Sequence, residues 1–373
     1  MTDFLAYINW DVNPNIIESP IMVRYYGVLW ASSFILGLWL MKKMMNNDKA
    51  PEAYTDKIFI YVMAGAVIGA RLGHVFFYDW DQYKDNLLDI FKIWEGGLAS
   101  HGGLIGVVLA LWLYSRNITK RNILWAGDKV VVTVAIAACL IRVGNLMNSE
   151  IIGTQSDSSA ALFFEYEAKQ GIIRSINQMT EGKLEVSEME ITEAGSNADG
   201  PIGNLKVNVS SQTPIDQAYL DIIVSNIKSS MATRFDPKED HIAYYGDKTG
   251  QISVNGNSGY FDFEVRIIPR IPTQIWEAFS YLIIFGVMMF GYWIKHWYRR
   301  EGLLFGLFLV LLFGARFIIE FWKEHQTLSD DAALNMGQWL SIIPFVIGAL
   351  IMFRAFKLPE KDTTVLESEY KKS

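Results

Sequence analysis

Seven long apolar runs constrain the fold of this chain of 373 residues more than any other feature. A helix needs about 20 mainly apolar residues to cross roughly 30 Å of bilayer hydrocarbon. Runs of about this length lie at 21–41, 58–78, 98–115, 129–148, 274–294, 302–322 and 336–356. Because lipid offers backbone groups no hydrogen-bond partners, we expect these runs to be helical. The sequence predicts an all-α polytopic membrane protein with seven transmembrane helices, the third being the shortest.

The composition agrees with a membrane protein. The chain is 51% hydrophobic and only 20% charged, and its formal net charge is −7. No basic patch is present, so we expect no nucleic-acid partner. The single cysteine, Cys139, lies in an apolar run and has no intrachain disulfide partner. The first 20 residues lack a basic region and a cleavage site, so we do not expect a removable signal peptide.

Lysine and arginine residues near the ends of the runs predict the orientation, since cytoplasmic loops carry an excess of both. The first 23 residues contain neither, whereas basic residues follow the first, third, fifth and seventh runs. These residues are Lys42, Lys43, Lys49, Lys57, Arg116, Lys120, Arg121, Lys295, Arg299, Arg300, Arg354, Lys357 and Lys361. We therefore expect the N-terminus outside and the C-terminus in the cytoplasm.

This orientation places the polar residues of the runs at one depth, in the outer half of the membrane. Polar and charged groups in lipid are costly and usually face a partner or a water-filled cavity. The set comprises Arg24, Tyr25, Arg71, His74, His101, Arg142, Asn145, Gln274, Glu277, Arg316, Glu320 and Gln338. We interpret them as one chamber that is open to the outside or to the outer leaflet.

A polar segment at about 154–268 separates the fourth and fifth runs and should be extracytoplasmic. Threonine and proline at 213–214 predict a helix start, followed by helical apolar spacing over 215–231. Alternation over 260–267 predicts a strand, and the small and acidic residues of 182–203 predict a mobile region. We expect an inserted α+β domain. The expected organisation is 1–153 with helices one to four and half of the site, 154–268 with the insertion, and 269–373 with helices five to seven, the other half of the site and a cytoplasmic tail.

Arg142 and Arg316 come from different runs at the same expected depth. Two converging guanidiniums would form a fork for a phosphate group. Alternatively, Arg142 pairs with Glu150 and Arg316 pairs with Glu320 in purely structural ion pairs. The two interpretations overlap, because a glutamate can orient the arginine that binds a ligand.

Three other residues have similarly open interpretations. His101 begins the stretch His-Gly-Gly, whose glycines allow close helix approach; its imidazole is either a base or donor, or a packing residue. Arg71 either extends the basic wall of the chamber or points outward to the interface. Tyr25 is either a ligand contact or a member of the interfacial aromatic belt.

Several blocks of residues resemble the bacterial prolipoprotein diacylglyceryl transferases. They occur in the family's order, and the block that begins at Arg142 is highly specific. The blocks are Arg71-Leu-Gly, Phe77-Tyr78, Lys92 to Gly106, Arg142 to Gly153, Pro272 to Glu277, Arg316 to Phe321 and Met336 to Pro344.

This resemblance implies an activity, two substrates and a location. Family members transfer the diacylglyceryl group of phosphatidylglycerol to the lipobox cysteine thiol of a preprolipoprotein. The reaction forms a thioether, releases glycerol phosphate and is the first step of lipoprotein maturation, at the outer side of the bacterial inner membrane. The signal peptide of the preprolipoprotein is itself a membrane segment. No metal or organic cofactor is expected, since binding and electrostatics suffice for an activated phosphate ester.

The resemblance also implies roles for individual residues. Arg142 matches the arginine that binds phosphatidylglycerol, and Arg316 matches a second essential arginine. Both would neutralise charge on the leaving phosphate. His101 is the expected base, with Glu150 and Glu320 as alternatives. The expected catalytic residues are His101, Arg142, Asn145, Glu150, Arg316 and Glu320, and the expected lipid-binding residues are Tyr25, Arg71, Arg142, Gln274, Glu277 and Arg316.

The chain departs from the family pattern in three places. Ile271 replaces a histidine before Pro-Thr-Gln, so that histidine cannot be essential here. Residues 322–326 replace a stretch that commonly leads to an arginine and Pro-Asp. The segment 154–268 exceeds the short loop expected of the family and could be a lid, a docking surface for lipoprotein substrates or a passive elaboration.

Two other classes of membrane protein fit the sequence less well than the transferase. A seven-helix photoreceptor would need a lysine for a retinal Schiff base in the seventh run, and none is present between 336 and 356. A seven-helix receptor would not require two arginines and a histidine at one outer depth. An anion or lipid transporter would suit the arginines, but such proteins usually show paired halves or helices broken at the midplane. Neither feature is visible in the sequence.

Overall fold

The computed structural model describes residues 7–92, 97, 99–197, 200–236, 240–246, 250–323 and 334–366. The chain forms two compact units, which we call the α+β unit and the helical unit. The α+β unit consists of Met1–Gly27, Arg142–Trp276 and Ile319–Ala332, and the helical unit of Val28–Ile141, Glu277–Ile318 and Ala333–Ser373. Residues 142–153 therefore group with the polar segment that follows them.

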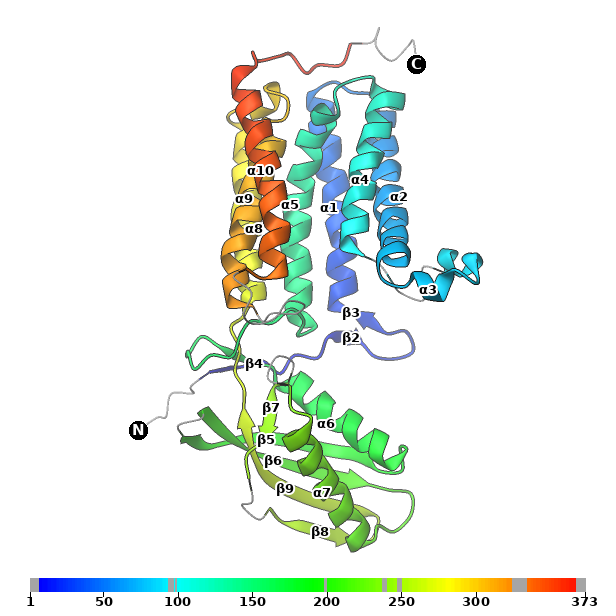
Figure 1. Cartoon of the computed structure of the whole chain (residues 1–373), viewed down its shortest axis with the longest axis vertical. Helices are drawn as coiled ribbons and strands as arrows, with labels where there is room; N and C mark the ends of the chain where they lie inside the picture. The colour runs from blue at the N-terminus through cyan, green and yellow to red at the C-terminus, as the bar shows by residue number, and fades with distance from the viewer. Residues whose placement is uncertain are drawn as a thin grey trace. The chain divides into compact units, whose positions relative to one another are not determined.

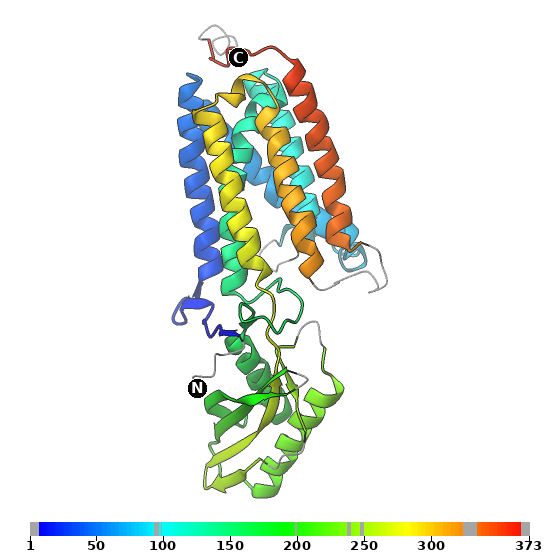
Figure 2. The same cartoon turned by 90° about the vertical axis from the view of Figure 1, so that its left-hand side faces the viewer.

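Long helices run side by side in the helical unit (Figures 1 and 2). They are α1 (Tyr25–Asn47), α2 (Glu52–Phe77), α4 (Ser100–Tyr114), α5 (Ile123–Met147), α8 (Thr273–Trp293), α9 (Leu303–Ile319) and α10 (Met336–Lys357). The shorter helices are α3 (Trp80–Tyr83), the 3-10 turns Leu87–Phe91, Trp297–Arg299 and Glu320–Trp322, and the π turn Ser115–Thr119.

Six of these helices, within the described part of the chain, are long and apolar enough to cross a membrane. The exception is α4, whose 15 residues span about 22 Å at 1.5 Å per residue. The chain is thus a mostly helical, multi-pass membrane protein, and the count of seven spans stays a prediction.

Helices α2 and α4 approach each other through glycines, as the His-Gly-Gly stretch predicted. A Cβ built on Gly69 would lie 2.4 Å from the carbonyl oxygen of Gly102, and one built on Gly106 would lie 2.0 Å from that of Gly65. Glycines at four-residue spacing let two membrane helices pack backbone to backbone. Any larger residue at these positions would separate α2 from α4.

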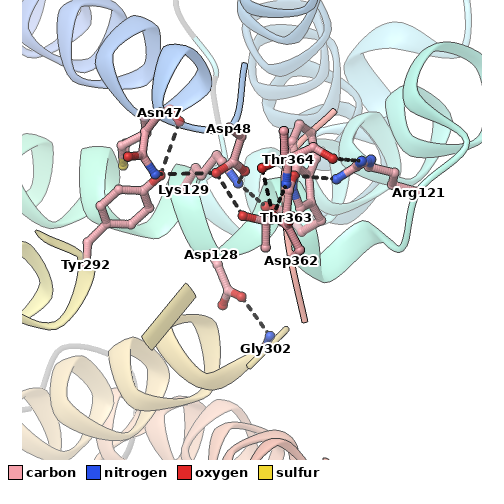
Figure 3. Close-up of polar contacts among 12 residues, drawn as sticks. Asn47, Asp48, Arg121, Asp128, Lys129, Tyr292, Gly302, Asp362, Thr363 and Thr364 are labelled. Carbon is pink, nitrogen blue, oxygen red and sulfur yellow. Dashed lines mark hydrogen bonds and ion pairs between the residues drawn. The ribbon is translucent and has the colours of Figure 1, made fainter. Parts of the chain in front are cut away.

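A buried polar cluster lies at the end of the bundle where α1 connects to α2 (Figure 3). Lys129 Nζ lies 2.7 Å from Asp48 Oδ2, and both side chains are only 1% exposed. Asp128 accepts hydrogen bonds from the backbone N–H groups of Gly302 and Phe305, at 2.7 and 2.8 Å. The carboxylate thereby satisfies the free donors at the start of α9.

The C-terminal segment closes over the same cluster. Arg121 donates to the carbonyl oxygens of Thr363 and Thr364, at 2.6 and 2.8 Å. The Thr363 hydroxyl donates to Asp48 Oδ1 at 2.9 Å, and the Val365 N–H donates to the Asp48 carbonyl at 2.7 Å. Because Val365 is also buried in the apolar core of this end, the segment is an integral part of the bundle.

The α+β unit contains a five-stranded sheet and the helices α6 and α7 (Figure 1). The sheet is antiparallel, with the order β5-β6-β9-β7, and β8 also pairs with β9. The bounds are α6 (Glu165–Thr180), β5 (Glu185–Asn197), β6 (Gly200–Ser210), α7 (Gln217–Thr233), β7 (Ile242–Tyr244), β8 (Ile252–Asn255) and β9 (Ser258–Ile267). Short strands β1 (Ile8–Asn9) and β4 (Leu162–Phe163) pair in parallel, and β2 (Asn15–Ile17) pairs with β3 (Val23–Arg24).

One face of the sheet packs against α6 and α7. Alternate residues of β6 and β9, including Val207 and its partner Phe261, join Ile176 and Val224 in a single buried core. The strand expected over 260–267 is therefore confirmed as most of β9. The alternating pattern buries one face of the strand, as a half-buried sheet requires.

Candidate functional site

The turn that follows α5 has an unusual backbone. Ser149 and Ile151 have φ angles of 55° and 58°, in the left-handed region. A β-branched residue in this region is a genuine outlier, because its side chain crowds the backbone. Such conformations cost about 1–3 kcal/mol each and persist only where surrounding contacts hold them. The turn therefore presents Glu150 between two strained residues.

A chain of side-chain hydrogen bonds links three expected site residues. Arg142 Nη1 donates to Asn145 Oδ1 at 3.3 Å, and Asn145 Nδ2 donates to Glu150 Oε2 at 3.3 Å. Asn148 Nδ2 donates to the other carboxylate oxygen of Glu150 at 3.2 Å. Arg142 and Asn145 share one stripe of α5, as their spacing predicted, and Asn145 orients the guanidinium relative to Glu150.

Two residues at the start of α8 hold the same turn from its backbone. Gln274 Nε2 donates to the carbonyl of Glu150 at 2.7 Å, and the Thr273 hydroxyl donates to the carbonyl of Ile151 at 3.1 Å. Both side chains are fully buried. Gln274 was expected as a lipid contact, whereas Thr273 and Asn148 were not among the expected site residues. The signal for Thr273 was its place beside Gln274, as a polar pair at the head of an apolar run.

Gly153 lies where three segments of the chain meet. Its N–H donates to the carbonyl of Ile271, and the N–H of Thr154 donates to the carbonyl of Trp322. A Cβ on Gly153 would lie 2.6 Å and 2.7 Å from these two carbonyl oxygens. Only glycine fits this junction without displacing backbone. Ile271, one of the departures from the family pattern, contributes here through its main chain.

Two further expected residues lie in the α+β unit. Glu320 Oε2 is 3.4 Å from Lys323 Nζ, and both side chains are largely buried. Tyr25 is exposed at the first position of α1, where its N–H donates to the carbonyl of Pro14. The rest of the departure at 322–326, from residue 324 onward, lies outside the described residues.

In the helical unit, Arg71 is buried rather than pointing outward to the interface. Its guanidinium donates to the carbonyls of Asp89, Ile90 and Gly97, at 2.7, 2.8 and 3.4 Å, and lies over the ring of Tyr83. The side chain thus organises the connection between α2 and α4. Residues 93–96 and 98 of this connection, part of one family block, lie outside the described residues.

The other expected residues of the helical unit lie near helix ends. His101 is exposed in the first turn of α4, and Arg316 is half-buried in the last turn of α9. Glu277 is fully buried in the second turn of α8 and accepts a hydrogen bond from Tyr281 at 3.4 Å. In the described ranges, His, Cys, Asp and Glu side chains form no group of three suited to a metal ion.

The comparison with known proteins agrees with the resemblance seen in the motifs. The sequence profile of the family described as prolipoprotein diacylglyceryl transferase matches residues 14–354. A phosphatidylglycerol–prolipoprotein diacylglyceryl transferase of Chloroherpeton thalassium is 32% identical over 364 residues, or 97% of this chain and 99% of that protein. The same name is given to a Porphyromonas gingivalis protein that is 34% identical over 365 residues, or 95% of this chain and 96% of that protein.

The lengths of these relatives also bear on the long segment between the fourth and fifth runs. Since the match covers nearly all of both chains, the Chloroherpeton protein is about as long as this one and has room for the same segment. The family profile in turn covers every element that carries the Arg142–Asn145–Glu150 chain and its supports from α8. This chain belongs to the prolipoprotein diacylglyceryl transferase family.

Proposed function

We propose that this chain transfers the diacylglyceryl group of phosphatidylglycerol to the lipobox cysteine thiol of preprolipoproteins. Membership of the family and the names of its relatives support the proposal. The structural observation that carries it is Arg142, a guanidinium late in the apolar helix α5 that is oriented through Asn145 toward Glu150. A cation held in an apolar helix at a fixed geometry suits an anionic lipid headgroup.

The proposed reaction is a displacement at carbon. The cysteine thiol loses its proton, and the thiolate sulfur attacks the glyceryl carbon that carries the phosphate ester. The carbon–oxygen bond breaks, its electron pair stays on the phosphate oxygen, and glycerol phosphate leaves. Arg142 and Arg316 stabilise the negative charge that develops on this leaving group.

His101 is the proposed base. It is exposed at the start of α4 and has a lone pair available when neutral. Glu150 accepts amide hydrogen bonds at both oxygens, which suits an orienting role toward Asn145. Glu320 is paired with Lys323. Glu150 and Glu320 are the alternative bases. The rate of transfer by His101→Gln, Glu150→Gln and Glu320→Gln, measured at rising pH, distinguishes the three candidate bases.

The remaining expected lipid contacts divide into two kinds. We assign Tyr25, which is exposed, to the lipid headgroup, and we assign Glu277, which is fully buried and accepts from Tyr281, an indirect effect on lipid binding. Gln274 and Arg71 hold backbone carbonyls and are positioning residues, since they fix the turn at Glu150 and the connection before α4. Their effect on the reaction is then exerted through the groups that they support.

The proposed topology has seven spans, with α4 as the third, an outer N-terminus and a cytoplasmic C-terminus. It follows from the distribution of lysine and arginine along the sequence. The segment 154–268 is then an extracytoplasmic insertion, and the reaction takes place at the periplasmic side of the bacterial inner membrane. Cysteine labelling in intact cells tests this arrangement at residue 17 and at residue 120, which are both exposed.

A direct assay tests the proposed function. Purified protein in detergent is incubated with phosphatidylglycerol and a synthetic lipobox peptide. We expect a thioether-linked diacylglyceryl peptide and one glycerol phosphate per peptide, both detected by mass spectrometry. A peptide with serine in place of the lipobox cysteine is the control. A folded protein that yields neither product would refute the proposal.

A further inference from the structure

The α+β unit contains a large open cavity whose lining includes Glu150. Its volume is about 1160 Å³, above the range of roughly 300–1,000 Å³ that is usual for small-molecule sites. The walls come from α6, the end of α7, residues 234, 236 and 240–242, the turn at 148–152 and the β2–β3 hairpin. We call this cavity the α6 groove.

The lining of the α6 groove is polar and mixed in charge. Arg24, Arg174 and Arg234 lie among acidic side chains, and Arg174 is already paired with Glu167 at 2.7 Å. An acyl chain placed here would remove water from these groups and offer no hydrogen bonds in its place. The groove is therefore suited to a polar ligand that carries both donors and acceptors.

Three buried polar atoms of the lining have unused hydrogen-bonding capacity. Asn15 Oδ1, Asn148 Oδ1 and His241 Nδ1 have no partner among the residues that the structure describes. Buried polar atoms are nearly always paired with protein or water. His241 is 6% exposed, and its Nδ1 is one of these three atoms. A rotation of these side chains would turn the covered atoms toward the groove, where amide and imidazole groups can hydrogen-bond a peptide backbone whatever its side chains.

The groove is lined by the turn that carries Glu150, one of the proposed catalytic residues. The turn that lines it also carries the Asn145–Glu150 hydrogen bond and is held by Gln274. In the proposed reaction, the lipobox cysteine follows a membrane segment of the substrate, so the polar residues after the cysteine emerge on the outer side. A chain leaving the region of Glu150 could enter the groove directly.

We infer that the α6 groove binds the extended polar segment that follows the lipobox cysteine of the substrate. This inference rests on the proposed function, because it names the part of the peptide substrate that contacts the segment 154–268. Recognition through backbone hydrogen bonds would tolerate many different sequences after the cysteine. The segment 154–268 of the enzyme would then lower KM for the peptide substrate without taking part in the chemistry.

Gly171 of α6 offers a way to block the groove. It lines the cavity, and a Cβ built on it meets nothing nearer than Arg174 Nη2 at 4.0 Å. Gly171→Trp should therefore place an indole in the groove without a backbone clash. Gln178→Trp is the matched control, since Gln178 is exposed on the same helix and does not line the groove.

The test uses two lipobox peptides, one ending two residues after the cysteine and one with a ten-residue Ser/Asn/Gly tail. For the unsubstituted protein and Gln178→Trp, we expect KM to be about tenfold lower for the longer peptide, which corresponds to about 1.4 kcal/mol of binding. Gly171→Trp should abolish this ratio. Equal KM values for both peptides with the unsubstituted protein, or a full ratio in Gly171→Trp, would overturn the inference.

Binding is also measured without phosphatidylglycerol, by fluorescence anisotropy of the longer peptide with serine in place of the lipobox cysteine. We expect Gly171→Trp, but not Gln178→Trp, to weaken this binding about tenfold. Displacement of the peptide by glycerol phosphate would overturn the inference, since it would make the groove a headgroup site. Peptide binding without any lipid transfer would instead refute the proposed function and leave the groove as a peptide site.

Discussion

The side-chain amide of Gln274 lies 2.7 Å from the backbone carbonyl of Glu150, although the two residues are 124 positions apart in the sequence. The bond joins the first turn of α8 to the strained turn after α5. Since Gln274 is fully buried, it cannot exchange this partner for water. The orientation of Glu150, and through Asn145 that of Arg142, therefore depends on α8.

Replacing Gln274 should lower the rate of transfer. In Gln274→Ala the Glu150 carbonyl loses its donor, the turn relaxes, and we expect kcat to fall about ten- to a hundredfold, as misplaced reacting groups do. Gln217→Ala, at an exposed glutamine of α7, is the control. The measurement is kcat and KM for lipid transfer, together with the unfolding temperature in detergent. An unchanged kcat would show that the turn is held by other contacts.

Replacing Arg142 should remove transfer while leaving the fold intact. We expect no detectable product from Arg142→Ala and a loss of at least about tenfold in Arg142→Lys, because lysine keeps the charge but not the planar fork. The double variant Arg142→Lys, Arg316→Ala should be no slower than the slower single variant if both arginines act on one phosphate. Turnover by a correctly folded Arg142→Ala would remove the assigned role.

The junction at Gly153 should not accept a methyl group. In Gly153→Ala the new Cβ meets two backbone oxygens at 2.6 and 2.7 Å, and overpacking of this kind costs about 1–3 kcal/mol. We expect a lower unfolding temperature and slower transfer. Gly286→Ala on α8, where a Cβ meets nothing within 4 Å, should change neither. Equal behaviour of the two variants would contradict the geometry of the junction.

Replacing only one partner of the buried pair Lys129–Asp48 should lower the free energy of unfolding. Lys129→Met leaves the Asp48 carboxylate buried without its cation, and we expect a loss of about 3–5 kcal/mol in the free energy of unfolding. The double variant Asp48→Asn, Lys129→Met should recover part of this loss. Chemical unfolding of the three proteins in detergent measures the effect. A single variant as stable as the original protein would show that the pair contributes little.

His241 should make stability depend on pH. Burial, followed by the nearby Arg270, lowers the pKa of His241 from 6.5 to about 3. The folded protein favours the neutral imidazole, whereas the unfolded chain binds a proton below pH 6.5. The free energy of unfolding is therefore highest above pH 6.5 and falls as the pH is lowered toward 3. We expect the slope to approach about 1.4 kcal/mol per pH unit at most. His241→Gln should flatten this part of the stability curve, and an unchanged curve would contradict the assignment.

The sequence predicted the long helices well, and the deviations have physical causes. Helix α5 begins at Ile123 rather than near residue 129. Asp128 and Lys129 look like the edge of an apolar run, but in the structure they are buried, one capping α9 and the other paired with Asp48. Hydropathy cannot distinguish charges that face water from charges that satisfy one another.

In the polar segment, two expectations were wrong. The region 182–203 was expected to be mobile but lies mainly in the β5–β6 hairpin, where acidic residues of β5 are exposed and weaken the strand pattern. Helix α7 begins after Asp216, whose carboxylate accepts from two backbone N–H groups, rather than at 213–214. Asp216 is an equally good N-cap residue, so local preference alone could not choose between them.

The spacing of Arg142 and Asn145 predicted their shared stripe, yet the turn that carries Glu150 was beyond sequence reasoning. Its left-handed residues are serine and isoleucine, which give no sign of that conformation. They are held there by Thr273 and Gln274, which approach from a distant part of the chain. Tertiary contacts, not local preference, determine this part of the candidate site.

The C-terminal segment gives practical guidance for producing the protein. Residues 361–365 supply hydrogen bonds to Asp48 and Arg121 and an apolar side chain to the bundle. A purification tag or reporter that replaces residues 361–365 would remove these contacts and uncover the buried ion pair of Lys129 and Asp48. Fusions should begin beyond Leu366, and poor yield of a shorter version would reflect an opened bundle, with no bearing on catalysis.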